Sequence, residues 1–150
     1  GEAKAITILA ACELGRRRKE ETPLRKPVIR TSRDIYDWFY PVMADKQIEE
    51  CHVLLLNQAG RVIDSMLVSR GGLASASVDV RLIVREAIVR RATAVVLCHN
   101  HPSGNLIPSR QDDGLTTAVR QACYTMDISL LDHVIFTDSG YYSYADHGRI

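Results

Sequence analysis

The chain has 150 residues, of which 46% are hydrophobic and 25% are charged, and this composition excludes a disordered protein and suits a single domain with a substantial core. The formal net charge is only +1, so the overall electric field gives no reason to expect nucleic-acid or membrane binding. The cysteines lie far apart without zinc-finger or redox spacing, and no segment reads as a signal peptide or a transmembrane helix. We therefore expect a reduced, cytoplasmic protein that makes no membrane contact.

The N-terminal residues predict a helix that is followed by a linker. Residues 2–19 read as a helix with a basic last turn at 16–19, which the helix dipole favours at a C-terminal end. The alternative interpretation of these cations is contact with DNA phosphates. Residues 20–31 are polar and contain two prolines, which is typical of a linker.

Ser32 is the expected N-cap of a short helix that ends at Pro41 and buries Ile35, Trp38 and Phe39. Two apolar runs follow at residues 51–57 and 61–69. A turn at 57–60 joins them, which predicts a β-hairpin. The first run lacks alternation, so we expect a central strand that is covered on both faces.

The second half alternates helices and strands. Asp79 is the expected cap of an amphipathic helix, and a strand over 94–98 follows. A helix after Ser109 is expected to bury Leu115, Val119, Ala122 and Met126. A strand over 128–137 and a tyrosine-rich edge over 141–144 complete the chain. This order predicts an α/β fold with a mixed central sheet and flanking helices.

A candidate metal site lies where the strand over 94–98 ends. His99 and His101 are two residues apart, so both imidazoles point to the same face of an extended chain. Seven residues separate His101 from Ser109, and Asp112 falls at the third position of a helix capped by Ser109. Two imidazoles and one carboxylate form a three-ligand zinc site whose fourth position is open to water, as in a hydrolase. The motifs of zincins and of zinc deaminases are absent.

This spacing is that of the JAMM metal motif: His-x-His, seven residues, Ser, two residues, Asp. The chain resembles the bacterial RadC family in particular. The resemblance rests on the sequences at 99–104 (HNHPSG), 49–57 (EECHVLLLN), 75–78 (SASV) and 131–134 (LDHV). It covers nearly the whole chain from about Ser32 onward.

The resemblance implies a JAB/MPN domain over residues 32–150, with a deaminase-like fold and with Zn²⁺ on His99, His101 and Asp112. It implies that Ser109 assists the site by hydrogen bonding and that an upstream glutamate is the general acid/base. The start of the first strand offers Glu49 and Glu50, which point to opposite faces, and the resemblance favours Glu49. It further implies that residues 1–19 are the remnant of a helix-hairpin-helix module.

Other polar residues near the motif have less specific interpretations. We expect His52 and His133 to be hydrogen-bonded structural histidines, not ligands. Asp113 points about 100° away from Asp112 around the helix, so it is a poor second ligand. Ser103 has the chemistry to donate a hydrogen bond to a substrate oxyanion.

The family resemblance implies a zinc-dependent hydrolase of peptide or isopeptide bonds whose protein or peptide substrate is unknown. The alternative is a DNA-associated accessory protein in repair or recombination, which would contact DNA through the full-length N-terminal module. A third interpretation is a non-catalytic scaffold, and the complete ligand set argues against it.

Overall fold

The computed structural model describes residues 1–20, 26–71 and 78–150, and of residues 18–20 only the backbone. The elements in chain order are α1 (Glu2–Glu20), α2 (Ser32–Met43), β1 (Glu50–Leu56), β2 (Val62–Arg70), α3 (Val80–Val89), β3 (Ala94–Asn100), α4 (Arg110–Thr125), β4 (Ser129–Thr137) and β5 (Gly140–Ser143). Residues 21–25 of the expected linker and 75–77 of the motif at 75–78 lie outside the described residues.

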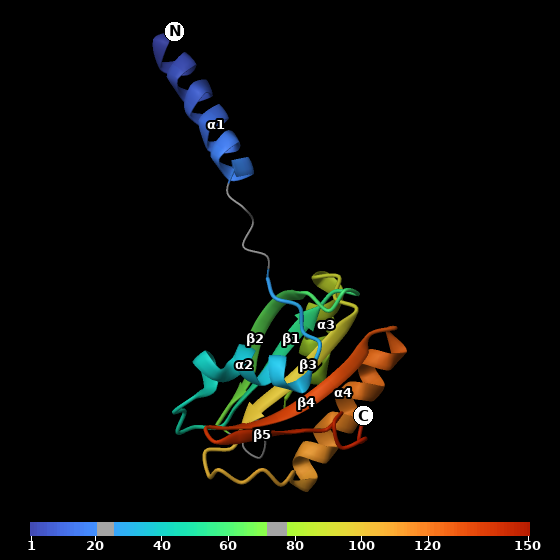
Figure 1. Cartoon of the computed structure of the whole chain (residues 1–150). Coiled ribbons are helices and arrows are strands. Elements are labelled where there is room, and N and C mark those ends of the chain that lie inside the picture. Colours follow the sequence, from blue (N-terminus) through green and yellow to red (C-terminus); the bar gives the residue numbers. More distant parts are fainter. Residues whose placement is uncertain (21–25, 72–77) are drawn as a thin grey trace.

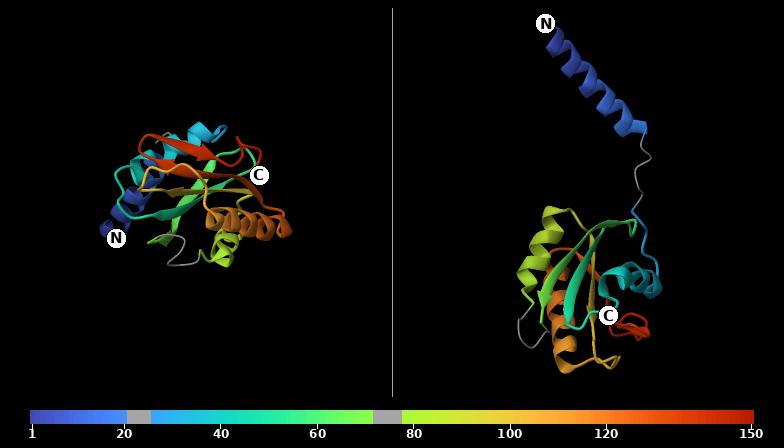
Figure 2. Two further views of the ribbon diagram at one scale, coloured as in Figure 1. Left: turned by 90° about the horizontal axis from the view of Figure 1, so that it is seen from below. Right: turned by 90° about the vertical axis from the view of Figure 1, so that its left-hand side faces the viewer.

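The strands form one mixed sheet in the order β2-β1-β3-β4-β5, drawn in Figure 1. β3 and β4 are parallel, whereas the pairs β1–β2, β1–β3 and β4–β5 are antiparallel. Helix α2 covers one face of the sheet, and α3 and α4 cover the other (Figure 2). The predicted mixed sheet with flanking helices and a preceding helix is confirmed.

Strand β1 is buried on both faces, as its unbroken apolar run predicts. Val53 and Leu55 pack with the residues of α3 and α4, and Leu54 and Leu56 pack with those of α2. Both hydrophobic cores therefore meet at this strand. Strand β3, the neighbour of β1 in the sheet, is buried in the same way. The metal motif at the end of β3 therefore begins in the packed interior of the sheet.

Helix α2 differs from the prediction at both ends. Thr31, not Ser32, is the N-cap, because its side chain accepts a hydrogen bond from the N–H of Asp34 while the Asp34 carboxylate accepts from the N–H of Thr31. Pro41 does not end the helix, which continues to Met43. The last turn is retained because the Met43 side chain is buried against the sheet and is 1% exposed.

The segment before α2 is attached to the β1–β2 hairpin. The N–H of Ile29 donates to the carbonyl of Gly60 over 2.9 Å, and the N–H of Val62 donates to the carbonyl of Pro27 over 3.0 Å. Gly60 has a φ of 71°, as the predicted turn requires. The described part of the expected linker therefore pairs with the turn of the hairpin.

The buried face of α4 is rotated from the predicted one. The buried residues are Asp112, Thr116, Val119 and Cys123. Met126, which was expected in the core, is 50% exposed. The prediction was correct for Val119, which is 0% exposed, and Leu115 packs against the core. It was wrong for Met126 because it assigned the core by hydrophobicity, whereas the first two turns of α4 bury polar side chains that have hydrogen-bond partners at the sheet.

Helix α1 lies apart from the sheet in Figures 1 and 2, and its large apolar side chains are exposed. Arg16 and Arg17 at its basic end both pair with Glu13. Within the described residues, neither α1 nor any other helix is long and apolar enough to cross a membrane.

Candidate metal centre

The end of β3 aligns the two histidines of the motif. His99 lies inside the strand, between Cys51 of β1 and Ile135 of β4, and it is 0% exposed. The N–H of His101 donates to the carbonyl of Phe136 over 2.9 Å, so the chain stays beside β4 beyond the last residue of β3. Because the extended conformation continues through His101, both imidazoles lie on one face of the sheet.

The first turn of α4 brings Asp112 to the same place. The N–H of Asp112 donates to Oγ of Ser109 over 3.1 Å, and the N–H of Ser109 donates to Oδ2 of Asp112 over 2.6 Å. This reciprocal cap is the one that the spacing predicts. It holds a carboxylate that is 1% exposed in a fixed orientation at the helix N-terminus.

The three predicted ligands converge. Nε2 of His99 lies 2.9 Å from Nε2 of His101 and 3.0 Å from Oδ1 of Asp112. Nε2 of His101 lies 3.6 Å from Oδ2 of Asp112. Ligands placed tetrahedrally at zinc distances are separated by about 3.3 Å from one another. The observed separations lie on either side of this value, so the side chains fit a zinc ion.

The electrostatics of the cluster favour a cation. Burial acts to raise the pKa of Asp112, but its interactions with the neighbouring His101 and His99 outweigh burial and hold the pKa well below its ordinary value. The hydrogen bond to Asp112 in turn raises the pKa of His101. The site therefore keeps a negative carboxylate and stabilises positive charge beside it.

The orientation of His101 suits a ligand. Its Nδ1 lies 2.6 Å from the carbonyl oxygen of Asn105, which can only accept a hydrogen bond. Nδ1 therefore carries a proton, and in the neutral ring Nε2 presents its lone pair to Asp112. This lone pair and the carboxylate repel each other unless a proton or a metal ion lies between them, which makes the pair a cation site.

The two candidate glutamates occupy different environments. A carboxylate oxygen of Glu49 lies within 4.8 Å of a ring nitrogen of His99 and of one of His101. Glu50 is buried and its carboxylate bonds with three side chains, those of Lys46, His52 and Arg70. The structure thus brings Glu49, not Glu50, to the cluster. The assignment of Glu49 as the acid/base stays a prediction.

A residue that sequence analysis did not single out fixes the backbone around Glu49. The buried side chain of Asn100 accepts a hydrogen bond from the N–H of Glu50 over 2.7 Å and donates one to the carbonyl of Ile48 over 3.1 Å. These bonds hold the residues on either side of Glu49. The only feature of the sequence that could have indicated this role is the position of Asn100 between the two histidines of the motif.

His133 and Thr116 form a buried layer behind the ligands. Nε2 of His133 lies 2.8 Å from Nδ1 of His99, and Nδ1 of His133 lies 2.6 Å from Oγ1 of Thr116. Burial and the neighbouring His99 hold the pKa of His133 well below its ordinary value, so its ring is neutral. His133 is hydrogen-bonded as expected, but its partner is a predicted ligand. Nothing in the sequence pointed to Thr116.

The remaining candidates lie outside the cluster. His52 binds Glu50. The Asp113 carboxylate accepts hydrogen bonds from the hydroxyl of Tyr144 and from Arg149, both over 2.7 Å. Ser103 accepts a hydrogen bond from the N–H of Asn105, and no interaction tests its expected part in oxyanion binding.

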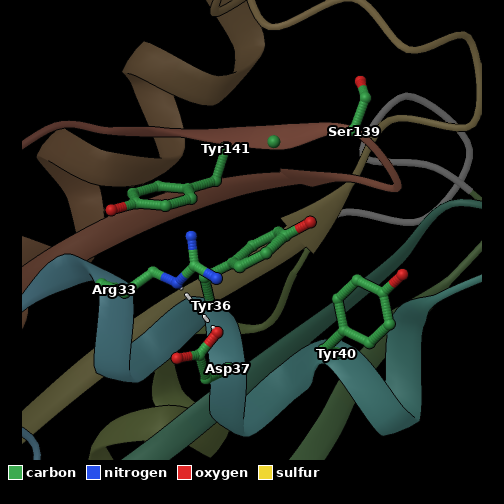
Figure 3. A pocket seen from close by; sticks show the side chains of 7 residues that line it. Arg33, Tyr36, Asp37, Tyr40, Ser139 and Tyr141 are labelled. Atoms are coloured by element: carbon green, nitrogen blue, oxygen red, sulfur yellow. Dashed lines mark hydrogen bonds and ion pairs between the residues drawn. The ribbon is translucent and has the colours of Figure 1, made fainter.

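Two cavities bear on the location of a substrate. One of about 170 Å³ borders His101 and is lined in part by Lys46, Ser103 and Gly104. A wider one of about 520 Å³ lies between α2 and β5 and is shown in Figure 3. Its walls are tyrosine rings and the ion pair of Arg33 with Asp37, and none of the cluster residues lines it. Of these two cavities, only the smaller one contacts a residue of the cluster, His101.

Comparison with known proteins places this chain in a family. Residues 29–149 match the family model described as a RadC-like JAB domain. The chain is 43% identical to a UPF0758 protein of Flavobacterium johnsoniae over 148 residues, which are 99% of the chain and 65% of the relative. It is 45% identical to a UPF0758 protein of Porphyromonas gingivalis over 151 residues, covering 100% of the chain and 66% of the relative. The chain thus spans slightly less than two thirds of the length of these relatives, and it belongs to the RadC-like JAB domain family.

Proposed function

We propose that this chain is a zinc-dependent hydrolase of the JAMM type that cleaves peptide or isopeptide bonds. The observation that supports the proposal is the convergence of His99, His101 and Asp112 within 2.9–3.6 Å. The carboxylate of Glu49 beside the two histidines adds the acid/base that such a reaction needs. Membership of the RadC-like JAB domain family agrees with this chemistry.

In this proposal His99, His101 and Asp112 would hold the zinc, and the cavity beside His101 would admit the substrate. The bound ion would polarise the scissile carbonyl and lower the pKa of water to about 7. Glu49 accepts the proton of the attacking water as the new C–O bond forms. It then delivers a proton to the amine as the C–N bond breaks, so that the products are a carboxylic acid and an amine.

A pair of neighbouring aspartates offers a matched test of the metal site. Elemental analysis of purified wild-type protein should return about one zinc per chain. Asp112→Asn should abolish zinc binding, whereas Asp113→Asn should retain it, because Asp113 faces Tyr144 and Arg149. Equal zinc contents in the two variants would contradict the ligand set.

The acid/base is tested with the two glutamates. A screen of peptide and isopeptide substrates identifies one that the wild type cleaves. Glu49→Gln should then lose turnover by about 10²–10⁴-fold while keeping its zinc. Glu50→Gln should keep turnover, because its carboxylate binds Lys46 and Arg70. Normal turnover of Glu49→Gln would refute its assignment.

Association of the full-length protein with DNA is the second candidate, as an accessory role in repair or recombination. The exposed Arg16 and Arg17 in the last turns of α1 favour it, although Glu13 neutralises part of their charge. If they contact phosphates, duplex affinity should fall steeply with salt concentration, and Arg16→Ala with Arg17→Ala should reduce the slope by about 2. An affinity that is insensitive to salt would exclude this candidate.

A further inference from the structure

His133 lies behind the candidate metal centre, and the proposed reaction gives it no part. It is fully buried in β4, with one ring nitrogen facing His99 and the other facing Thr116. Both histidines can exist in two neutral tautomers that place the proton on different nitrogens. The surrounding hydrogen bonds determine which tautomer each ring adopts.

The main-chain carbonyl of Asp112 determines which nitrogen carries the proton in each of the two histidine rings. The hydroxyl of Thr116 donates its proton to the main-chain carbonyl of Asp112 over 2.7 Å. Its Oγ1 therefore has to accept from Nδ1–H of His133 at 2.6 Å. Nε2 of the neutral His133 is then an acceptor, and it accepts from Nδ1–H of His99 at 2.8 Å.

This series of hydrogen bonds ends at the His99 ring and leaves its Nε2 without a proton. With its proton on Nδ1, the His99 ring presents the Nε2 lone pair to Oδ1 of Asp112, 3.0 Å away. In the opposite tautomer, an N–H bond would point toward Asp112 and occupy the direction that a metal ion needs. Only the first tautomer can bind a metal through Nε2.

We propose that Thr116 and His133 form a hydrogen-bond relay that holds His99 in the Nδ1–H tautomer and so positions it as a metal ligand. This inference rests on the proposed function, because it assumes that His99 binds the ion. The relay begins on the main chain of Asp112 and ends on the ring that faces the Asp112 side chain. The relay thus connects the backbone of one predicted ligand to the imidazole of another.

Packing restrains the plane of the His133 ring. The ring of Tyr144 stacks on it with a centroid separation of 5.0 Å and an interplanar angle of 10°. The Tyr144 hydroxyl is itself fixed by its hydrogen bond to Asp113 over 2.7 Å. His133 and Thr116 are positioning residues, since they act on the metal through His99.

Two substitutions of Thr116 separate the hydroxyl from the packing of the side chain. Thr116→Val keeps the shape but removes the acceptor for His133, and Thr116→Ser keeps the hydroxyl. Zinc affinity, measured by competition with a chelator, should fall about 10–100-fold in Thr116→Val. Thr116→Ser should stay within about threefold of the wild type. Equal affinities in wild type and Thr116→Val would overturn the relay.

A second measurement reads the tautomers of the metal-free protein directly. Long-range ¹H–¹⁵N correlation spectra, recorded where the histidines are neutral, should show Nδ1–H for His99 and His133 in the wild type. An Nε2–H signal from His99 in the wild type would overturn the relay even if Thr116→Val failed to fold. Absence of zinc binding by the wild type would refute the proposed function, and the spectra would still decide the relay.

Discussion

The substitution Asn100→Ala gives a quantitative test of how Glu49 is held. It removes a buried carboxamide, 3% exposed, that bonds to the main chain of Ile48 and Glu50. The N–H of Glu50 is left buried without an acceptor, which costs about 1–3 kcal/mol. The carbonyl of Ile48 lies in a partly exposed position and can accept from water, so loss of that bond costs about 0.5–1.5 kcal/mol.

The expected loss in the free energy of unfolding is therefore about 1.5–4.5 kcal/mol, measured by urea denaturation. A released backbone at Glu49 should also lower turnover by about 10²-fold while zinc content stays unchanged, because a small displacement of a reacting group has an effect of this size. Turnover is measured on the substrate identified in the screen.

Asn57→Ala is the matched control at the other end of β1. The Asn57 side chain also makes two main-chain hydrogen bonds, both accepted by its Oδ1 from the N–H groups of Ala59 and Arg61, but it lies in the hairpin turn. This variant should lose stability and keep both zinc and turnover. If Asn100→Ala lowers the free energy of unfolding by less than about 1 kcal/mol, or if its turnover matches that of Asn57→Ala, then the Asn100 side chain does not hold the backbone at Glu49.

Three further predictions concern metal, pH and the core. When the free zinc concentration is 100–1,000 times the dissociation constant, removing zinc with a chelator should lower the free energy of unfolding by about 3–4 kcal/mol. An unchanged thermal transition would refute the metal site. Burial acts to raise the pKa of Glu50, but hydrogen bonds from His52 and Lys46 prevail and lower it. This stabilisation is complete above the ordinary glutamate pKa near ~4.3, and it is lost as the pH falls through the lower pKa of the folded state. The free energy of unfolding of Glu50→Gln should therefore decline less steeply than that of the wild type over this acidic pH range. Equal declines would count against the pairing of Glu50 with His52 and Lys46. Leu54→Ala should lower the free energy of unfolding by about 2–5 kcal/mol, because the Leu54 side chain is 0% exposed. Ile107→Ala should change it by no more than about 0.5 kcal/mol, because Ile107 is 73% exposed. Equal losses in urea denaturation would contradict the packing of Leu54.

The convergence of the three predicted ligands could be predicted because it depends largely on local geometry. His99 and His101 share a face through the alternation of extended backbone. Asp112 is placed by the cap of its own helix, three residues after Ser109. Glu49 was favoured by resemblance, and its separation from Glu50 followed from the same alternation.

The residues that orient the ligands could not be predicted from the sequence. His133 meets His99 across 34 positions, and Asn100 meets Glu50 across 50 positions. Such contacts depend on which strands are neighbours, and several orders of the same strands satisfy the hydrophobic pattern. Only the parallel pairing of β3 with β4 brings His133 behind the ligands.

The α/β pattern, the buried central strands and the spacing of the metal motif are encoded locally, because periodicity and capping act over a few residues. Which polar groups are buried depends instead on how the helices pack on the sheet. Thr116 lies in the interior although Met126 has the more apolar side chain. A hydroxyl can be buried at little cost only where a donor and an acceptor are already in place, and here Asp112 and His133 supply them.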